Sequence, residues 1–333
     1  MNEPIRLSPA GKDYLWGGKR LKTEYGKKIR MTPLAETWEC STHPDGLCTV
    51  ADGSYKGMTL AQVLKDHPEY IGTHPDMRAD KPGELPILIK FIDAAADLSV
   101  QVHPGDSYAR RYEQGSRGKT EMWYVLDAAE GARLVYGLSH DSDPDTIREA
   151  IGSGRLSEHL QYVPISANDV FYVKAGTIHA IGAGALIAEI QENSNITYRL
   201  YDYDRKDKDG NKRPLNIDRA LEVADLKRAG APVQPMRVLR YEPGVARELL
   251  CRCRYFEVQR MLVNAPVDKG ISYGSDSLSF RVLLCIDGEG GIRYGTGSNA
   301  VSVDITKGDC IFIPADSVSM RIFGRLQLLD ICG

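Results

Sequence analysis

Short segments in which apolar and polar residues alternate recur along most of the chain, and Gly, Asp, Asn or Pro bound them. A period of two is typical of strands, because successive side chains of a strand point to opposite faces. In the first two thirds these segments are residues 87–93, 98–103, 121–126, 169–173, 185–191 and 195–201. In the last third they are residues 255–263, 279–286, 291–294, 301–305, 310–313 and 326–331. Many short strands without regular strand–helix alternation favour a sandwich or a barrel over a doubly wound sheet.

Helical spacing of apolar residues is less frequent. It predicts short helices at residues 58–66, 144–151, 156–160 and 218–227, with Asp143 as N-cap and Pro144 at the first position of the second. The polar segment 201–213 is expected to form an exposed loop beyond its first residues. The small residues and prolines of 229–235 (AGAPVQP) indicate a junction between two domains.

Two segments of the chain resemble each other. Residues 168–179 (NDVFYVKAGTIH) and 308–319 (GDCIFIPADSVS) share an Asp, an apolar run and an Ala in register, which places His179 opposite Ser319. Any strand–turn–strand unit has some of this pattern, but the coincidence in register favours two related barrels. Only the first of them would then carry a potential metal ligand.

Composition excludes several classes of protein. The chain has 333 residues, enough for about two domains, and its 42 Lys and Arg against 45 Asp and Glu give a net charge of -3. This balance gives little attraction for nucleic acid or an anionic membrane. The seven cysteines are odd in number and form no CxxC pair, so we expect free thiols. We expect a cytoplasmic protein, because no secretory signal and no long apolar run is visible.

Polar side chains gather on predicted strands that also carry core residues. Alternation puts Gln101 and His103 on one face of their strand, and Glu121 and His179 begin two others. Two imidazoles and a carboxylate suit zinc or non-haem iron. The alternatives are satisfied core or surface histidines and, for Lys119 and Glu121, a solvated ion pair.

A fourth cluster lies near residue 190. Glu189 sits among apolar neighbours and is expected to face a cavity, and Arg199 follows on the next predicted strand. An inward arginine beside carboxylates can bind a phosphate or an oxyanion. A cross-strand Glu–Arg pair is the structural alternative.

Six motifs together identify a family. They are LWGG (15–18), AETWE (35–39), LSVQVHP (98–104), GKTEMWYVLDA (118–128), AGTIHAIGAG (175–184) and AEIQENSNITYRLYDYDR (188–205). In order and spacing they resemble the type I mannose-6-phosphate isomerases of the cupin superfamily, and the short bacterial branch in particular. The resemblance covers residues 16 to 205 motif by motif, and the last third only in length and strand pattern.

The resemblance implies a mainly β fold of two cupin-like jelly-roll barrels with helical insertions. It implies a catalytic domain at 1–230 and a cupin-like β domain at 231–333 without metal ligands. The implied enzyme is a zinc-dependent aldose–ketose isomerase that interconverts mannose 6-phosphate and fructose 6-phosphate through a cis-enediol or enediolate. We expect one Zn²⁺ per chain, a phosphosugar as the substrate, and a monomer or homodimer.

The same resemblance assigns residues to roles. The implied metal ligands are Gln101, His103, Glu121 and His179. The implied catalytic residues are Arg199, Lys119 and Glu189, with Lys119 and Glu189 as rival bases. The implied substrate-binding residues are Lys90, Ser99 and Trp16.

The sequence departs from the family pattern at two positions. Lys174 stands where the cupin turn commonly has Pro, and Asn195 stands where the long branch carries an Asp, so a proton role at 195 is in doubt. Two other classes compete with the isomerase: a cupin oxygenase that uses iron, and a sugar-binding cupin without catalytic activity. Gln101 disfavours the oxygenase, because it fills an additional coordination position.

Overall fold

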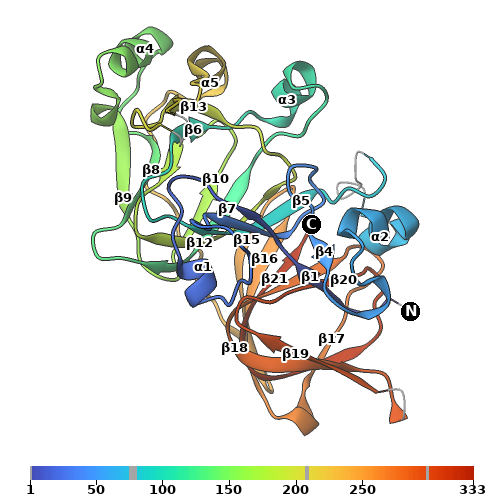
Figure 1. Cartoon of the computed structure of the whole chain (residues 1–333). Coiled ribbons are helices and arrows are strands. Elements are labelled where there is room, and N and C mark those ends of the chain that lie inside the picture. The colour runs from blue at the N-terminus through green and yellow to red at the C-terminus, as the bar shows by residue number, and fades with distance from the viewer. Residues whose placement is uncertain (1, 75–80, 207–209, 298–299) are drawn as a thin grey trace.

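The computed structural model describes residues 2–74, 81–206, 210–297 and 300–333, and it is mainly β (Figure 1). A six-stranded antiparallel sheet has the order β10 (Val170–Val173), β7 (Glu121–Ala128), β12 (Ala185–Glu192), β5 (Ile87–Asp93), β3 (Glu36–Cys40), β2 (Ala10–Lys12). A five-stranded sheet has the order β13 (Tyr198–Tyr201), β6 (Val100–Val102), β11 (His179–Ile181), β8 (Arg133–Leu138), β9 (Leu160–Pro164).

The third sheet contains most of the C-terminal strands. Its main path is β14 (Arg240–Glu242), β15 (Val245–Arg252), β16 (Glu257–Ala265), β21 (Met320–Cys332), β18 (Arg281–Tyr294), β20 (Cys310–Ile313), β1 (Ile5–Ser8), β4 (Thr49–Val50). Strand β17 (Ile271–Tyr273) pairs with β21, and β19 (Val301–Thr306) pairs with β18. Two N-terminal strands therefore join the sheet of the C-terminal third.

Short helices lie between the strands. The α-helices are α1 (Arg20–Thr23), α2 (Leu60–Asp66), α3 (Asp106–Tyr112), α4 (Pro144–Gly152) and α5 (Ile217–Val223). The 3-10 turns are η1 (Gly53–Tyr55), η2 (Pro68–Ile71), η4 (Leu156–Glu158) and η5 (Val267–Lys269). Figure 1 shows α3, α4 and α5 at one end of the molecule, near β6 and β13, with β18 and β19 at the other. No helix in the described ranges is long and apolar enough to span a membrane.

Strand β12 shows how alternation divides the core into layers. Ile187 packs in a cluster between the six- and five-stranded sheets, together with Trp123 and Phe171. Ala188 and Ile190 point the other way, into a cluster shared with the C-terminal sheet. A strand buried on both faces needs apolar residues at every position, so the polar residues of its inner face are exceptions that require partners.

Most predicted strands are present, with different ends. The predictions 87–93 and 310–313 coincide with β5 and β20, whereas 98–103 shortens to β6 and 195–201 to β13. The predicted strands 279–286 and 291–294 are one long strand, β18. It continues through a bulge after Cys285 because β21 pairs with it on both sides. The 201–213 loop lies partly outside the described residues.

Two helix predictions are too long. At 156–160 only the 3-10 turn η4 forms, because Leu160 already pairs with Leu138 as the start of β9. Helix α5 ends at Val223, since Ala224 is extended. Helix α4 begins as predicted, and the Asp143 side chain accepts hydrogen bonds from the backbone N–H groups of Asp145 and Thr146.

The predicted internal repeat has a matching local structure. Asn168 and Gly308, which precede the shared Asp, both have positive φ angles, 74° and 96°. Asp169 accepts a hydrogen bond from the N–H of Ser166 at 2.8 Å, and Asp309 accepts one from Thr306 at the same distance. The division into a domain at 1–230 and one at 231–333 stays a prediction, as do the two closed barrels. All seven cysteines are free, as expected.

Candidate active site

Strand pairing brings the predicted polar residues together between the six- and five-stranded sheets. Gln101 of β6 lies opposite His179 on one side and Arg199 on the other. In the facing sheet, Glu189 of β12 lies opposite Lys90. The two sheets thus collect residues that lie up to 109 positions apart in the sequence, which no local pattern could place in contact.

Each histidine of the cluster has a defined tautomer. The Nδ1–H of His103 donates to the carbonyl oxygen of Ile196 at 2.8 Å, and that of His179 donates to the carbonyl oxygen of Thr177 at 2.8 Å. A carbonyl can only accept, so Nδ1 carries the proton and Nε2 keeps its lone pair. Carbonyl oxygens that orient histidines in this way are typical of metal sites.

The ligand atoms of these histidines converge with Glu121. The two Nε2 atoms lie 3.2 Å apart, and Glu121 Oε1 lies 3.4 Å from that of His179. One ligand atom from each of the three buried residues falls within 4.8 Å of the others. Two lone pairs and a carboxylate that face one another repel, and Lys119 Nζ offsets this only at Glu121 Oε2 and His103 Nε2. Glu121 Oε1, which faces His179, has no hydrogen-bond partner among the described residues, so this donor set fits a divalent metal.

The protonation of the histidines agrees with this fit. Burial, together with the charge of Lys119, lowers the pKa of His179 to about 4 and holds the pKa of His103 well below its ordinary value. Both imidazoles are therefore neutral at pH 7, as metal ligation requires.

Gln101 is adjacent to this cluster and held by Ser99. The Ser99 hydroxyl donates to Gln101 Oε1 at 3.1 Å, and Gln101 Nε2 lies 3.5 Å from Nε2 of His179. The amide group thus faces the cluster through its nitrogen. A half-turn of the amide would present the oxygen instead, because the two ends of an amide have nearly the same shape.

Buried charges of alternating sign continue from the cluster across the six-stranded sheet. Lys119 Nζ lies 2.6 Å from Glu121 Oε2 and 3.9 Å from Glu189 Oε1. Lys90 Nζ lies 3.2 Å from the same Glu189 oxygen and 3.7 Å from Glu36 Oε2. Because negative and positive groups alternate, each charge has a partner of opposite sign, which makes their burial tolerable. The five charged residues of this row are Glu121, Lys119, Glu189, Lys90 and Glu36.

The two central carboxyl groups respond differently to their surroundings. Burial raises the pKa of Glu121, although Lys119 opposes the shift. For Glu189 burial acts in the same sense, but Lys119 and Lys90 together outweigh it and hold the pKa of Glu189 below its ordinary value. Glu189 is therefore a stable anion, and the Trp123 indole N–H also donates to it at 3.0 Å.

The predicted substrate-binding residues have protein partners. Lys90 is buried between two carboxylates, and its Nζ lies 4.8 Å from the centre of the Trp38 ring. Trp16 is buried in the core between the two sheets, with its ring 5.6 Å from that of Tyr14. These contacts suit a role in holding the site together.

Arg199 is the least engaged of the predicted residues. Its buried Nε has no hydrogen-bond partner in the described part of the chain. Burial and the nearby charge of Arg213 lower the pKa of Arg199. The ordinary pKa of an arginine lies so far above 7 that the side chain stays charged. A guanidinium group whose buried Nε has no partner among the described residues suits an anionic ligand.

Asn195 lines a polar cavity whose lining residues include neither His103 nor His179. A cavity of about 310 Å³ is bounded by, among others, Asn195 and Ile196, whose carbonyl orients His103. The Asn195 amide donates to Asp45 Oδ2 at 2.8 Å across the cavity wall. An amide at this position holds the cavity wall and supplies no titrating group.

Two further residues that the sequence pattern did not predict belong to the site. Glu36 ends the row of charges, and the hydroxyl group of Tyr14 is close enough to Glu36 and Lys90 for their charges to contribute to its pKa. Burial, as the largest cause, raises that pKa to about 12. The alternation in AETWE could have indicated Glu36 as an inward carboxylate, whereas no local pattern distinguishes Tyr14.

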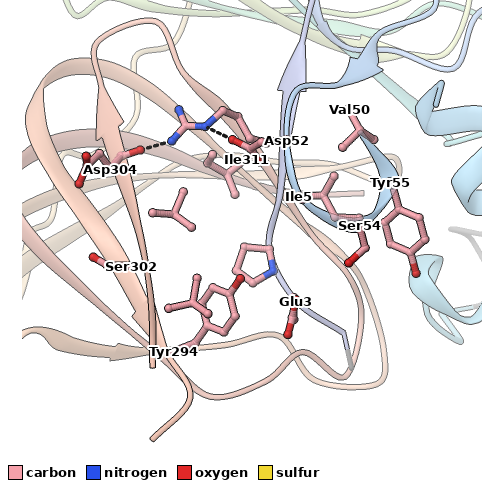
Figure 2. Close-up of a pocket in the computed structure, with 15 residues that line it drawn as sticks. Glu3, Ile5, Val50, Asp52, Ser54, Tyr55, Tyr294, Ser302, Asp304 and Ile311 are labelled. Carbon is pink, nitrogen blue, oxygen red and sulfur yellow. Dashed lines mark hydrogen bonds and ion pairs between the residues drawn. The ribbon is translucent and has the colours of Figure 1, made fainter. Parts of the chain in front are cut away.

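A larger cavity lies elsewhere and contains none of the predicted residues. Figure 2 shows this space of about 540 Å³ between the N-terminal segment and the β18–β19 hairpin. Arg6 crosses it, bonded to Asp52 at 3.2 Å and to the backbone oxygen of Asp304. Arg6 is also paired with Asp309 Oδ2 at 2.7 Å, so two carboxylates of the protein already neutralise its charge.

Known proteins resemble this chain over its full length. The family model for the catalytic domain of type I phosphomannose isomerase matches residues 5–131. The mannose-6-phosphate isomerase of Streptococcus mutans is 34% identical over 329 residues, covering 99% of this chain and 98% of that one. ManA of Bacillus subtilis, also a mannose-6-phosphate isomerase, is 35% identical over 334 residues and 98% of each chain. The crystal structure of a Bacillus subtilis mannose 6-phosphate isomerase superimposes with a TM-score of 0.88 at 32% identity, covering 99% of both chains.

Proposed function

This chain belongs to the type I mannose-6-phosphate isomerase family, and from that premise we propose that it interconverts mannose 6-phosphate and fructose 6-phosphate. The observation that carries the proposal is the buried His103–Glu121–His179 cluster with Lys119 and Glu189 beside it. The similarity to the relatives extends over 98% or more of this chain, so the matched region spans the segments that carry the cluster.

The proposed cofactor is one Zn²⁺ per chain. His103 and His179 would bind it through Nε2, Glu121 through its carboxylate, and Gln101 through Oε1 after the half-turn of its amide. Three neutral ligands and one carboxylate leave a net positive charge, which as a Lewis acid would polarise the two oxygens of the substrate. After that half-turn the Gln101 Nε2–H would donate to Ser99 Oγ, in place of the present hydrogen bond in which Ser99 donates to Oε1, so Ser99 would still hold the amide from behind.

The isomerisation moves one proton between carbons and another between oxygens. A base removes the proton from C2 of mannose 6-phosphate, the electron pair forms the C1=C2 bond, and O1 gains a proton. Return of the carbon proton to C1, with loss of the proton on O2, gives fructose 6-phosphate. The intermediate is a cis-enediol or enediolate, so the site needs a base and a group that binds a developing oxyanion.

We assign these two tasks to Lys119 and Arg199. Lys119 lies between the two carboxylates, with Nζ 3.0 Å from His103 Nε2, and is therefore next to the proposed metal. Glu189 is the rival base, but its low pKa and its hydrogen bonds to Trp123 and Lys90 favour a role in holding Lys119. Arg199 has an unpartnered Nε and would stabilise the enediolate. Lys90 would support the site from behind Glu189.

A coupled assay tests the proposal. Purified protein is incubated with mannose 6-phosphate as isolated, after treatment with EDTA, and after addition of Zn²⁺, and fructose 6-phosphate is measured. We expect turnover that EDTA abolishes and Zn²⁺ restores. Full activity after verified removal of metal would contradict the metal assignment. Oxygen consumption with Fe²⁺, or sugar binding without turnover, would favour the oxygenase or the binding protein instead.

A further inference from the structure

A second polar cavity lies in the C-terminal part of the chain, far in sequence from the histidines. It has a volume of about 470 Å³ and contains two arginines. Its lining residues are Arg247, Gln259, Ser272, Tyr273, Gly274, Ser275, Arg281, Ser317, Ser319 and Asp330. Four of them are serines, which carry hydroxyl groups, and Gln259 carries an amide group, so the lining is rich in hydrogen-bonding groups.

The charged residues of this cavity point into the core of the C-terminal sheet. Asp330 shares a strand face with Leu328, and Arg281 shares one with Leu283; both leucines belong to the core cluster of this sheet. Such a face is apolar unless partners compensate for the burial of charge. The interior of this half of the molecule therefore changes from apolar to polar at one end.

One carboxylate neutralises only half of the positive charge there. Asp330 is 2% exposed, and it accepts hydrogen bonds from the Tyr273 hydroxyl at 2.8 Å and from Arg281 Nη1 at 3.1 Å. Arg247 Nη1 lies 3.8 Å from its other oxygen. Arg281 and Tyr273 hydrogen-bond to Asp330, whereas Arg247 Nη1 only approaches it and donates instead to Met261 Sδ at 3.1 Å, so two guanidinium groups share one carboxylate. The cavity keeps one positive charge and several guanidinium donors.

The cavity lies where the internal repeat places it. The turn before Ser319 repeats the turn before His179: Asp316 has a φ of 52° and Gly176 one of 92° in the corresponding region. Ser319 precedes β21 as His179 begins β11. The end of the sheet that holds metal ligands in the first half thus holds arginines and serines in the second.

We propose that this cavity binds the phosphate group of a small phosphorylated polyol, such as a sugar phosphate. A guanidinium group can donate two parallel hydrogen bonds to two oxygens of one phosphate group. This interaction is strongest where part of the surrounding water is excluded. Ser272 and Ser319 are exposed at the mouth of the cavity, and Gln259 lies beside Asp330 on the neighbouring strand. These groups match the hydroxyls of a polyol, which inorganic phosphate lacks.

Calorimetric titration of the full chain at low ionic strength tests the site. The probes are sorbitol 6-phosphate, which has no carbonyl group and so is not isomerised, and inorganic phosphate. In the variant Ser319→Asp a carboxylate at the exposed mouth repels the anion without removing a buried contact. Arg240→Gln is the matched control, because the Arg240 side chain is 82% exposed and lies outside the cavity.

We expect Ser319→Asp to bind sorbitol 6-phosphate at one site fewer than the wild type and Arg240→Gln. We also expect Arg281→Gln to lose the same site, with inorganic phosphate binding there at least about tenfold more weakly than sorbitol 6-phosphate. Equal numbers of sites in Ser319→Asp and the wild type would overturn the proposal. Equal affinity of the two probes would overturn the assignment of a polyol. Neither result depends on turnover of mannose 6-phosphate.

Discussion

Two backbone carbonyl groups determine which atoms His103 and His179 present to the site. Both rings donate from Nδ1, so both Nε2 lone pairs face Glu121. The carbonyl groups belong to Ile196 and Thr177, which lie in the segments before β13 and β11. The chemistry of the two histidines therefore depends on loop backbone as much as on the residues themselves.

At the same scale, replacement of Lys119 distinguishes between Lys119 and Glu189 as the catalytic base. Lys119→Met should lower kcat by about a hundredfold or more, with a smaller effect on KM, because a general base acts mainly in the transition state. Glu189→Gln should lower kcat less. Steady-state kinetics of both variants, with zinc content measured alongside, check this. Near-normal kcat in Lys119→Met with only a raised KM would show that Lys119 is not the base.

At the scale of elements, strand β12 connects the site to the C-terminal third. Its last residue, Glu192, is buried and accepts a hydrogen bond from the backbone N–H of Thr120 at 2.8 Å, next to Lys119 and Glu121. Burial, with the charge of Asp106 next in importance, raises the pKa of Glu192 to about 8. Asp106 of α3 also accepts a hydrogen bond from the hydroxyl of Tyr255 at 3.1 Å.

Glu192 should make the stability of the fold depend on pH. Its pKa rises from 4.5 in the unfolded chain to about 8 on folding, so the folded state holds the extra proton between these values. The free energy of unfolding should therefore fall as the pH rises through this window. Each pKa unit corresponds to about 1.4 kcal/mol, so the effect is on the order of a few kcal/mol.

Glu192→Gln tests this element directly. The amide can still accept from Thr120 and donate to Asp106, but it cannot ionise, so the variant should be more stable than the wild type at pH 8 and similar at pH 5. Urea unfolding in EDTA at both pH values measures the difference without a contribution from metal. The exposed Glu130→Gln is the control. A parallel loss of stability with pH in wild type and Glu192→Gln would rule out this residue as the cause.

For the whole molecule, one hydrophobic cluster joins the two proposed domains. It contains Ile5 and Leu7 of β1, Ile89 of β5, and Phe312 and Leu329 of the C-terminal strands. Strand β1 pairs with β20 and β4 through its two edges. The outer face of the six-stranded sheet is thus covered by the C-terminal half.

This shared core predicts that residues 1–230 do not fold alone. Without the C-terminal sheet, the apolar faces of β5 and β12 would be exposed to water. Each Å² of apolar surface exposed in this way costs about 25 cal/mol of folding free energy. We expect the fragment to be insoluble or to lack cooperative unfolding, and the full chain to unfold in one transition. Expression of the fragment and calorimetry of the full chain measure both. A soluble 1–230 fragment with a sharp transition would show that the two domains are independent.

The polar pattern determined much of the candidate site in advance. Gln101, His103, Glu121, Lys119 and His179 interrupt apolar strands, and such interruptions are costly unless they serve a purpose. The boundaries of the strands and helices were predicted less accurately where strand pairing, and not the alternation pattern, determines them. Strand β18 extends across 287–290 because β21 continues beside it, and η4 replaces a predicted helix because Leu160 is taken into β9.

The sequence by itself determined the mainly β class, the family and the set of inward polar residues, because alternation and motif order are local properties of the chain. Only the tertiary structure decided that His103 and His179 expose Nε2, since the carbonyls that orient them come from other segments. It also decided that Lys90 is enclosed by Glu36 and Glu189, and that Arg247 and Arg281 share one cavity. These are contacts across strands, and their free energy depends on distances and burial that appear only when the sheets pack.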